Sequence, residues 1–227
     1  MIRFLLGSLG IIYGAGCTIT VYKLILMQKD NPFYWYFGMG FTSYFILWVI
    51  ILRKKEAFWS IVEHELTHAL VGFMFRKRVQ ALNARRNSGG SVRIEGGNLL
   101  IALAPYFLPL PAVLVALFLP ILKAQFLPYL NTAVGFLYGS HMFPLFKEFH
   151  FDQPDIRNSG IILATILTIT GNIFFLGIIL ATLNGNLSDL KAFLLQTFWA
   201  SMAIFNMIVT YIYQQFVLEN LNNPVNF

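Results

Sequence analysis

One stretch decides how the rest of the chain is interpreted: Ala57-Phe-Trp-Ser-Ile-Val-Glu-His-Glu-Leu-Thr-His-Ala-Leu-Val-Gly-Phe-Met-Phe75. It is mostly apolar and free of proline, yet its centre reads His64-Glu65-Leu66-Thr67-His68, an H-E-x-x-H motif. Each ionisable side chain at the centre of a membrane helix costs about 2.5–3.5 kcal/mol on insertion scales. Such a helix has to face the protein interior, and a bound cation would compensate its charges. The alternatives are that these side chains pair with one another, or that the helix lies outside the membrane.

The composition indicates a membrane protein. Of the 227 residues, 57% are hydrophobic and 11% are charged, whereas a soluble domain carries about 25% charged residues. The net charge is +6, but the basic residues form short clusters between apolar segments. That pattern is typical of membrane-flanking loops, so we expect no nucleic-acid partner. The single cysteine, Cys17, excludes an intrachain disulfide framework and a thiolate metal site.

The apolar segments predict an all-α polytopic membrane protein with about six to seven transmembrane helices. A spanning helix needs about 20 apolar residues. The segments that approach this length are Phe4–Met27, Phe33–Leu52, Ala57–Phe75, Leu99–Leu122, the shorter Asn131–Phe146, Ser159–Leu183 and Phe193–Phe216. Prolines within Leu99–Leu122 predict a bent span packed against its neighbours. We expect residues 1–227 to form a single multi-pass domain, integral to the cell (inner) membrane.

The connection 76–98 is basic and then glycine-rich, and it predicts a short strand or hairpin near residues 87–98. Val92 and Ile94 alternate with polar residues between two glycine pairs. A lone strand there would have an unpaired edge, to which an extended peptide could add. The alternative is a loop without regular structure.

The spacing of the motif predicts zinc as the cofactor. His64 and His68 are four residues apart, so a helix presents both imidazoles on one face to a single ion. Glu65 is their neighbour and can reach a water on that ion. Two histidine ligands, an open water position and a glutamate general base are the arrangement of a zinc hydrolase.

Two histidines do not complete a zinc site, and the sequence leaves the third ligand open. The candidates are Asp155, Asp152, Glu148, His150 and His141. Chain direction places the connection 147–158 on the side of the membrane nearest His68, from which Asp155 could reach the ion. However, residues 152–155 also have the pattern of a helix start, with Asp152 as N-cap and Asp155 in the first turn.

Residues 60–160 resemble the site-2 protease family of intramembrane zinc metalloproteases, in its small bacterial-type branch. The resemblance rests on the H-E-x-x-H motif within a span, on the glycine-rich stretch 87–98 leading into residues 103–109, and on Asp155 after Gln153-Pro154. The chain departs from the family's Leu-Asp-Gly and Asn-Pro-Asp-Gly forms, because Ile156 follows Asp155. Asp152 therefore stays an alternative ligand. The substrate-clamping asparagine is not identified, and His141 is a candidate polar group near the metal.

The resemblance implies His64, His68 and Asp155 as zinc ligands and Glu65 as general base, within a metalloprotease core of about residues 57–183. It implies a membrane-embedded zinc metalloendopeptidase that cleaves transmembrane or juxtamembrane segments of membrane proteins, with those segments and the lipid bilayer as partners. One alternative is a membrane metalloprotease with a glutamate as third ligand, for which Glu148 is the candidate. Another is an inactive relative acting as a membrane chaperone or scaffold, against which the intact Glu65 argues.

Overall fold

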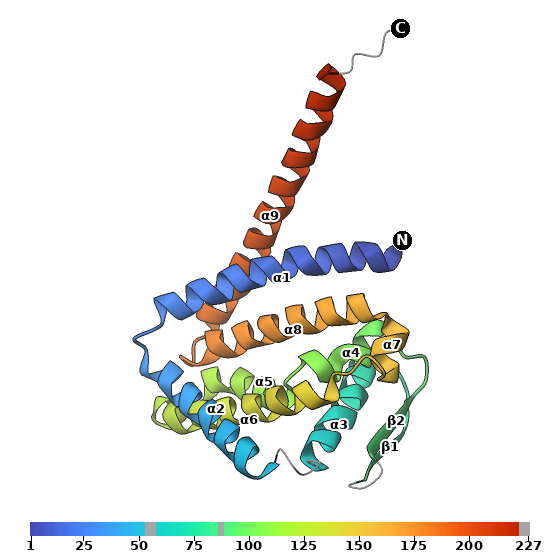
Figure 1. Cartoon of the computed structure of the whole chain (residues 1–227). Coiled ribbons are helices and arrows are strands. Elements are labelled where there is room, and N and C mark those ends of the chain that lie inside the picture. The colour runs from blue at the N-terminus through green and yellow to red at the C-terminus, as the bar shows by residue number, and fades with distance from the viewer. Residues whose placement is uncertain (53–57, 86–88, 223–227) are drawn as a thin grey trace.

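The computed structural model describes residues 1–52, 58–85 and 89–222, and most of them are helical (Figure 1). In chain order the elements are α1 (Ile2–Met27), α2 (Pro32–Ile50), α3 (Phe58–Met74), β1 (Val79–Arg85), β2 (Gly89–Ile94), α4 (Leu99–Phe107), α5 (Leu110–Phe118), η2 (Leu119–Ile121), η3 (Ala124–Phe126), α6 (Leu127–Glu148), α7 (Pro154–Ser159), α8 (Ile161–Thr182) and α9 (Leu187–Asn222). The predicted helical chain with a short β insertion is therefore confirmed.

The β insertion is larger than the sequence suggested. β1 and β2 pair as an antiparallel hairpin that begins at Val79, ahead of the expected range 87–98. Leu82 lies opposite Val92, and Asn83 lies opposite Ser91. The alternation around Val92 marked only the second strand. The parts of the predictions that concern residues 53–57 and 86–88 lie outside the described residues.

The number of membrane spans is lower than expected. By length and composition, four helices of the described residues can cross a membrane: α1, α2, α8 and residues 187–218 of α9. The bent pair α4 and α5 with η2 makes a fifth if it is counted as one span. These helices indicate a multi-pass membrane protein with four to five candidate spans among the described residues, fewer than the predicted six to seven. α3 has 17 residues and carries the ionisable motif, while α6 contains polar residues such as Asn131 and His141.

The predicted bend within residues 99–122 is confirmed. α4 ends at Phe107 and α5 begins at Leu110, with an angle of 78° between the two helices. Pro109 stands at the break and has no N–H to continue the helix. Tyr106 and Ala112, one on each side of the bend, are fully buried. The broken segment therefore packs against its neighbours on one face, as expected.

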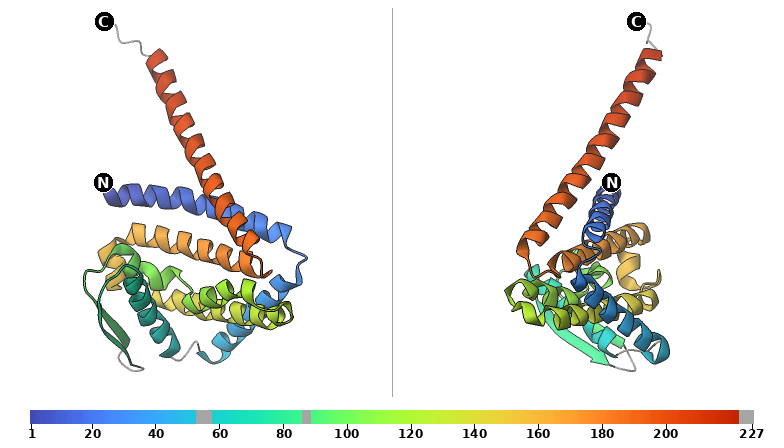
Figure 2. Two further views of the ribbon diagram at one scale, coloured as in Figure 1. Left: turned by 180° about the vertical axis from the view of Figure 1, so that it is seen from behind. Right: turned by 90° about the vertical axis from the view of Figure 1, so that its left-hand side faces the viewer.

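Two helix pairs form the body of the molecule. α1 and α8 lie side by side, and α2 packs along α6 (Figures 1 and 2). Glycines permit the second contact: a Cβ on Gly40 of α2 would overlap the Thr132 carbonyl, and one on Gly135 of α6 would overlap the Phe37 carbonyl. Small residues that let helix backbones approach are typical of packing within membranes. α9 begins beside α1 and then extends away from the other helices (Figure 2).

The last predicted spans have different ends from those expected. The segment from Ser159 is divided by Gly160, whose φ of 93° suits glycine and turns the chain from α7 into α8. α9 extends from Leu187 to Asn222, well beyond the predicted Phe193–Phe216. α7 is only 6 residues long, and it carries Asp155 in its first turn.

Candidate metal centre

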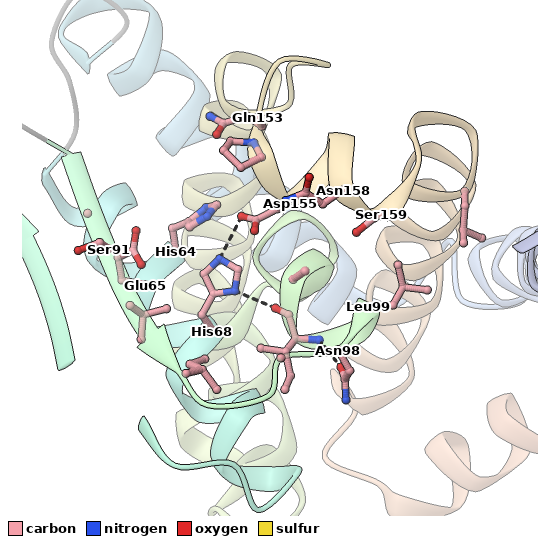
Figure 3. A pocket seen from close by; sticks show the side chains of 18 of the residues that line it. His64, Glu65, His68, Ser91, Asn98, Leu99, Gln153, Asp155, Asn158 and Ser159 are labelled. Atoms are coloured by element: carbon pink, nitrogen blue, oxygen red, sulfur yellow. Dashed lines mark hydrogen bonds and ion pairs between the residues drawn. The ribbon is translucent and has the colours of Figure 1, made fainter. Parts of the chain in front are cut away.

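Three potential ligands from two helices meet in one place. His64 and His68 lie on one face of α3, with ring centroids 4.9 Å apart. Oδ2 of Asp155, on α7, is 3.4 Å from Nε2 of His68 (Figure 3). One potential ligand atom from each of the three residues lies within 4.8 Å of the other two. The structure thus brings His64, His68 and Asp155 into a group that can hold a metal ion.

The donor set suits zinc. Two imidazoles and a carboxylate are the ligands of a catalytic zinc site that keeps its fourth position for water. Two ligands on neighbouring corners of a tetrahedral zinc site stand about 3.3–3.4 Å apart, given bonds of about 2.0–2.1 Å. The 3.4 Å between His68 and Asp155 matches that spacing. His68 is only 7% exposed, so its Nε2 faces the other donors and not bulk solvent.

A proline in α4 supplies the acceptor that orients His68. Nδ1 of His68 lies 2.8 Å from the carbonyl oxygen of Ile101. In a regular helix, that carbonyl would accept the N–H four residues later, which here is Pro105 and has no N–H. The carbonyl is therefore available to His68, whose Nδ1 donates to it. This fixes the tautomer that leaves the Nε2 lone pair for a metal.

A carboxylate from α6 plays the equivalent part for His64. Oε2 of Glu148 lies 3.7 Å from Nδ1 of His64. The other oxygen of Glu148, Oε1, accepts a hydrogen bond from the Ser60 hydroxyl, one turn before His64 on α3. Such outer carboxylates orient metal-bound histidines and raise their basicity. Glu148, the alternative third ligand, thus lies at Nδ1 of His64 and is not a member of the three-residue group.

Glu65 is held against the β-hairpin. Its side chain is 8% exposed, and it lies beside β2 (Figure 3). A Cβ added to Gly90 of β2 would overlap the Glu65 carboxylate, so a glycine is required for this close approach. Glu65, His64 and His68 all line the same cavity. The carboxylate that the motif predicts as the general base is therefore beside the three potential ligands.

The cavity has a volume of about 760 Å³, and β2 forms part of its lining. β2 contributes Gly90, Ser91, Val92 and Ile94 to the lining, and β1 contributes none of the described lining residues. β2 is therefore the strand of the hairpin that borders the cavity, and one of its edges is not paired with β1. An extended peptide could add to that edge.

The cavity lies at one end of two candidate spans. Its lining includes Arg3 in the first turn of α1 and Ser159 just before α8. α1 and α8 begin at this same end of the molecule (Figure 1). The potential ligands are thus grouped near the ends of the spans and not halfway along them.

Of the other predicted candidates, Glu148 contacts the group through His64, whereas Asp152, His150 and His141 have no described contact with its three members. Asp152 and His150 are exposed and do not line the cavity. Asp152 is also not the N-cap of α7, because Gln153 occupies that position. Nδ1 of His141 lies 3.4 Å from Oε1 of Glu63, behind α3, so His141 is a neighbour of the group and not a member.

Sequence reasoning missed three residues that shape the site. Pro105 was interpreted only as a source of bending, and Gly90 only as a strand or loop residue. Tyr106, within the stretch 103–109, has no predicted role, but its ring packs edge-on against His64 at 5.2 Å and is fully buried. Pro105 had a signal in the sequence: a proline within a helix always leaves the carbonyl four residues earlier without its usual partner.

No protein-family model, curated protein or solved structure matches this chain. The resemblance to the site-2 protease family therefore rests on the motif, the glycine-rich stretch and Asp155. The case for a function rests on the geometry of His64, Glu65, His68 and Asp155.

Proposed function

We propose that this chain is a membrane-embedded zinc metalloendopeptidase, integral to the cell (inner) membrane. The observation that supports it best is the meeting of His64 and His68 with Asp155, a residue far away in the sequence, while Glu65 lies in the same cavity. A binding scaffold needs neither this donor set nor a buried carboxylate beside it. His64, His68 and Asp155 would hold the zinc, and Glu65 would be the general base.

Each residue has a part in the proposed hydrolysis. A zinc ion held by these ligands would supply Lewis-acid chemistry, which would polarise the scissile carbonyl and lower the pKa of a bound water toward neutrality. Glu65 accepts a proton from the attacking water and can deliver it to the leaving amine. Ile101 and Glu148 hold the two imidazoles through their Nδ1 atoms, so that the Nε2 atoms keep their direction during the reaction.

The proposed substrates are membrane-protein segments in extended form, at or near the end of a span. A helix has no free backbone groups to offer, so a segment has to unwind before its carbonyl can reach the site. The free edge of β2 can hold such a strand by main-chain hydrogen bonds. The site lies near the ends of α1 and α8, which favours cleavage in juxtamembrane stretches over cleavage at the centre of a span.

Zinc content and cleavage, measured on the same preparations, test this function. The purified wild type should contain about one zinc per chain. His68→Ala and Asp155→Ala should lose most of it, whereas Glu65→Gln should keep the metal and lose cleavage of a membrane-protein substrate. Glu148→Ala should still fill with zinc when the metal is in excess, because Glu148 is proposed to orient His64 and not to bind the ion.

Three results would contradict the proposal in different ways. A wild type that takes up no zinc would remove the metal centre altogether. Loss of zinc in Glu148→Ala together with its retention in Asp155→Ala would favour the metalloprotease with a glutamate ligand. Full cleavage by Glu65→Gln would remove the proposed base.

A further inference from the structure

A second cavity is lined by residues of α1, α7 and α8. It has a volume of about 740 Å³ and lies between the first three turns of α1 and the start of α8. Aliphatic and aromatic side chains form most of its wall, among them Phe4, Ile11, Ile162 and Ile166. We refer to it as the α1–α8 groove. Since α1 and α8 are candidate spans, this groove opens where acyl chains surround the protein.

Two arginines stand at one end of the groove. Arg3 in the first turn of α1 and Arg157 in α7 both line it, and both are exposed. Nη2 of Arg3 donates to the Asn158 carbonyl at 3.1 Å, which fixes the guanidinium beside α7. Among the described residues that line the groove there is no aspartate or glutamate. Two positive charges thus line one mostly apolar cavity, and an anionic ligand would complement them.

The position of the arginines matches the layout of a phospholipid. Arg3 and Arg157 stand where α1 and α8 begin, at the same end of both helices (Figure 1). Basic side chains at the ends of spans reach the headgroup level, while the apolar wall continues along the helices. A single phospholipid could therefore place its phosphate on the arginines and an acyl chain along the groove.

We propose that the α1–α8 groove binds an anionic phospholipid, with its headgroup phosphate on Arg3 and Arg157 and an acyl chain against α1 and α8. The groove volume is in the range of small-ligand sites, about 300–1,000 Å³. Two arginines at one end of an otherwise apolar wall fit a ligand with an anionic head and an apolar tail, and a transmembrane segment carries no such head. We therefore assign the groove to a lipid and not to a transmembrane segment.

The lipid site adjoins the candidate metal centre. Arg3 and Leu163 line both cavities, so a bound headgroup stands at the mouth of the cavity that contains His64 and Glu65. The lipid proposal needs neither zinc nor catalysis, and its test can use metal-free protein. Failure of the lipid proposal would thus leave the proposed protease function unchanged. Failure of the protease proposal would likewise leave the lipid proposal unchanged.

Native mass spectrometry of the full chain with phosphatidylglycerol or phosphatidylcholine tests the proposal at low salt. Each arginine near an anionic headgroup contributes about fivefold in affinity. We expect phosphatidylglycerol to bind more tightly than phosphatidylcholine, and Arg3→Gln with Arg157→Gln to weaken it about 25-fold. Arg3→Lys with Arg157→Lys should keep most of the preference. Lys23→Gln, which removes a charge at the other end of α1, should have no effect.

A second variant separates the groove from the charges. Ser8 lines the groove, and its hydroxyl bonds only to the Phe4 carbonyl of its own helix. Ser8→Phe would fill the groove and leave both arginines in place, so it should also weaken the binding of phosphatidylglycerol. Equal binding of the two lipids, or unchanged binding by the double glutamine variant, would overturn the proposal. Displacement by inorganic phosphate alone, or by a hydrophobic transmembrane peptide in place of lipid, would assign the groove to another ligand and overturn it too.

Discussion

Nδ1 of His68 lies 2.8 Å from the carbonyl oxygen of Ile101, so a helix that binds no metal itself orients one of the potential metal ligands. Asn98 begins that helix by accepting the Ile101 N–H at 2.9 Å, and Pro105 leaves the Ile101 carbonyl without a helical partner. The N–H of Ile101 is therefore held by the helix cap, while its carbonyl oxygen is available to His68. Ile101 is thus part of α4 and also supports the site.

Replacing Pro105 by alanine tests this support. An alanine N–H would compete with His68 for the Ile101 carbonyl. Loss of an outer partner typically lowers metal affinity by about 10–100-fold. We expect the lower end, because a carbonyl has two lone pairs and can accept twice. Zinc affinity, measured by competition with a chelator, gives the result. Pro120→Ala, in η2 and outside the cavity lining, is the control, and an equal loss there would contradict the role of Pro105.

Replacing Gly90 by alanine should separate metal binding from catalysis. The added Cβ would overlap the Glu65 carboxylate, so the base has to move while the ligands on α3 and α7 stay in place. We expect zinc content to be unchanged and cleavage to fall by about 10²-fold or more, as for a misplaced general base. Gly97→Ala is the control, since Gly97 lines the same cavity and a Cβ there meets nothing within 4 Å. Equal activity of the two variants would remove the proposed role of Gly90.

Replacing Glu148 by glutamine should lower the affinity for zinc by about tenfold, while excess zinc should still fill the site. The amide keeps an oxygen for Ser60 but loses the charge beside His64. Cobalt substitution gives a second readout, since the visible spectrum reports the geometry of bound imidazoles and a purely structural role would not change it. Asp152→Asn removes a carboxylate from the exposed turn before α7 and should leave both measurements as in the wild type. An unchanged zinc affinity in Glu148→Gln would show that this carboxylate does not support His64.

Replacing Val92 by proline tests the edge of β2 as the docking site for a strand. Proline removes a backbone N–H and distorts the edge, so cleavage should fall while zinc binding remains intact. Leu82→Pro is the control for damage to the hairpin itself, because Leu82 lies opposite Val92 on β1, which contributes none of the described residues that line the cavity. The cleavage rate should fall more in Val92→Pro than in Leu82→Pro. Unchanged cleavage in Val92→Pro would rule out docking at this edge.

The arrangement of spans shows where sequence reasoning succeeds. Apolar length alone identified α1, α2, α8 and most of α9, because a bilayer imposes a minimum run of apolar residues. It overcounted at α3 and α6. The buried faces of α3 and α6 include polar side chains such as His68 and His141, whereas large apolar side chains such as Phe73 and Phe146 are exposed. Their apolar content therefore resembles that of a span, although α3 has only 17 residues.

The sequence by itself determined the pair His64 and His68 and the neighbouring Glu65, because a helix has a fixed period that puts residues four apart on one face. It also determined a multi-pass helical chain. Only the tertiary structure shows that Asp155, and not Asp152 or Glu148, joins the two histidines in one group of potential ligand atoms, since these residues lie far from the motif in the chain and helix packing sets their distances. It alone shows that the Ile101 carbonyl, Gly90 and Glu148 lie beside His68, Glu65 and His64. Those contacts depend on where α4, β2 and α6 meet α3, which no local pattern encodes.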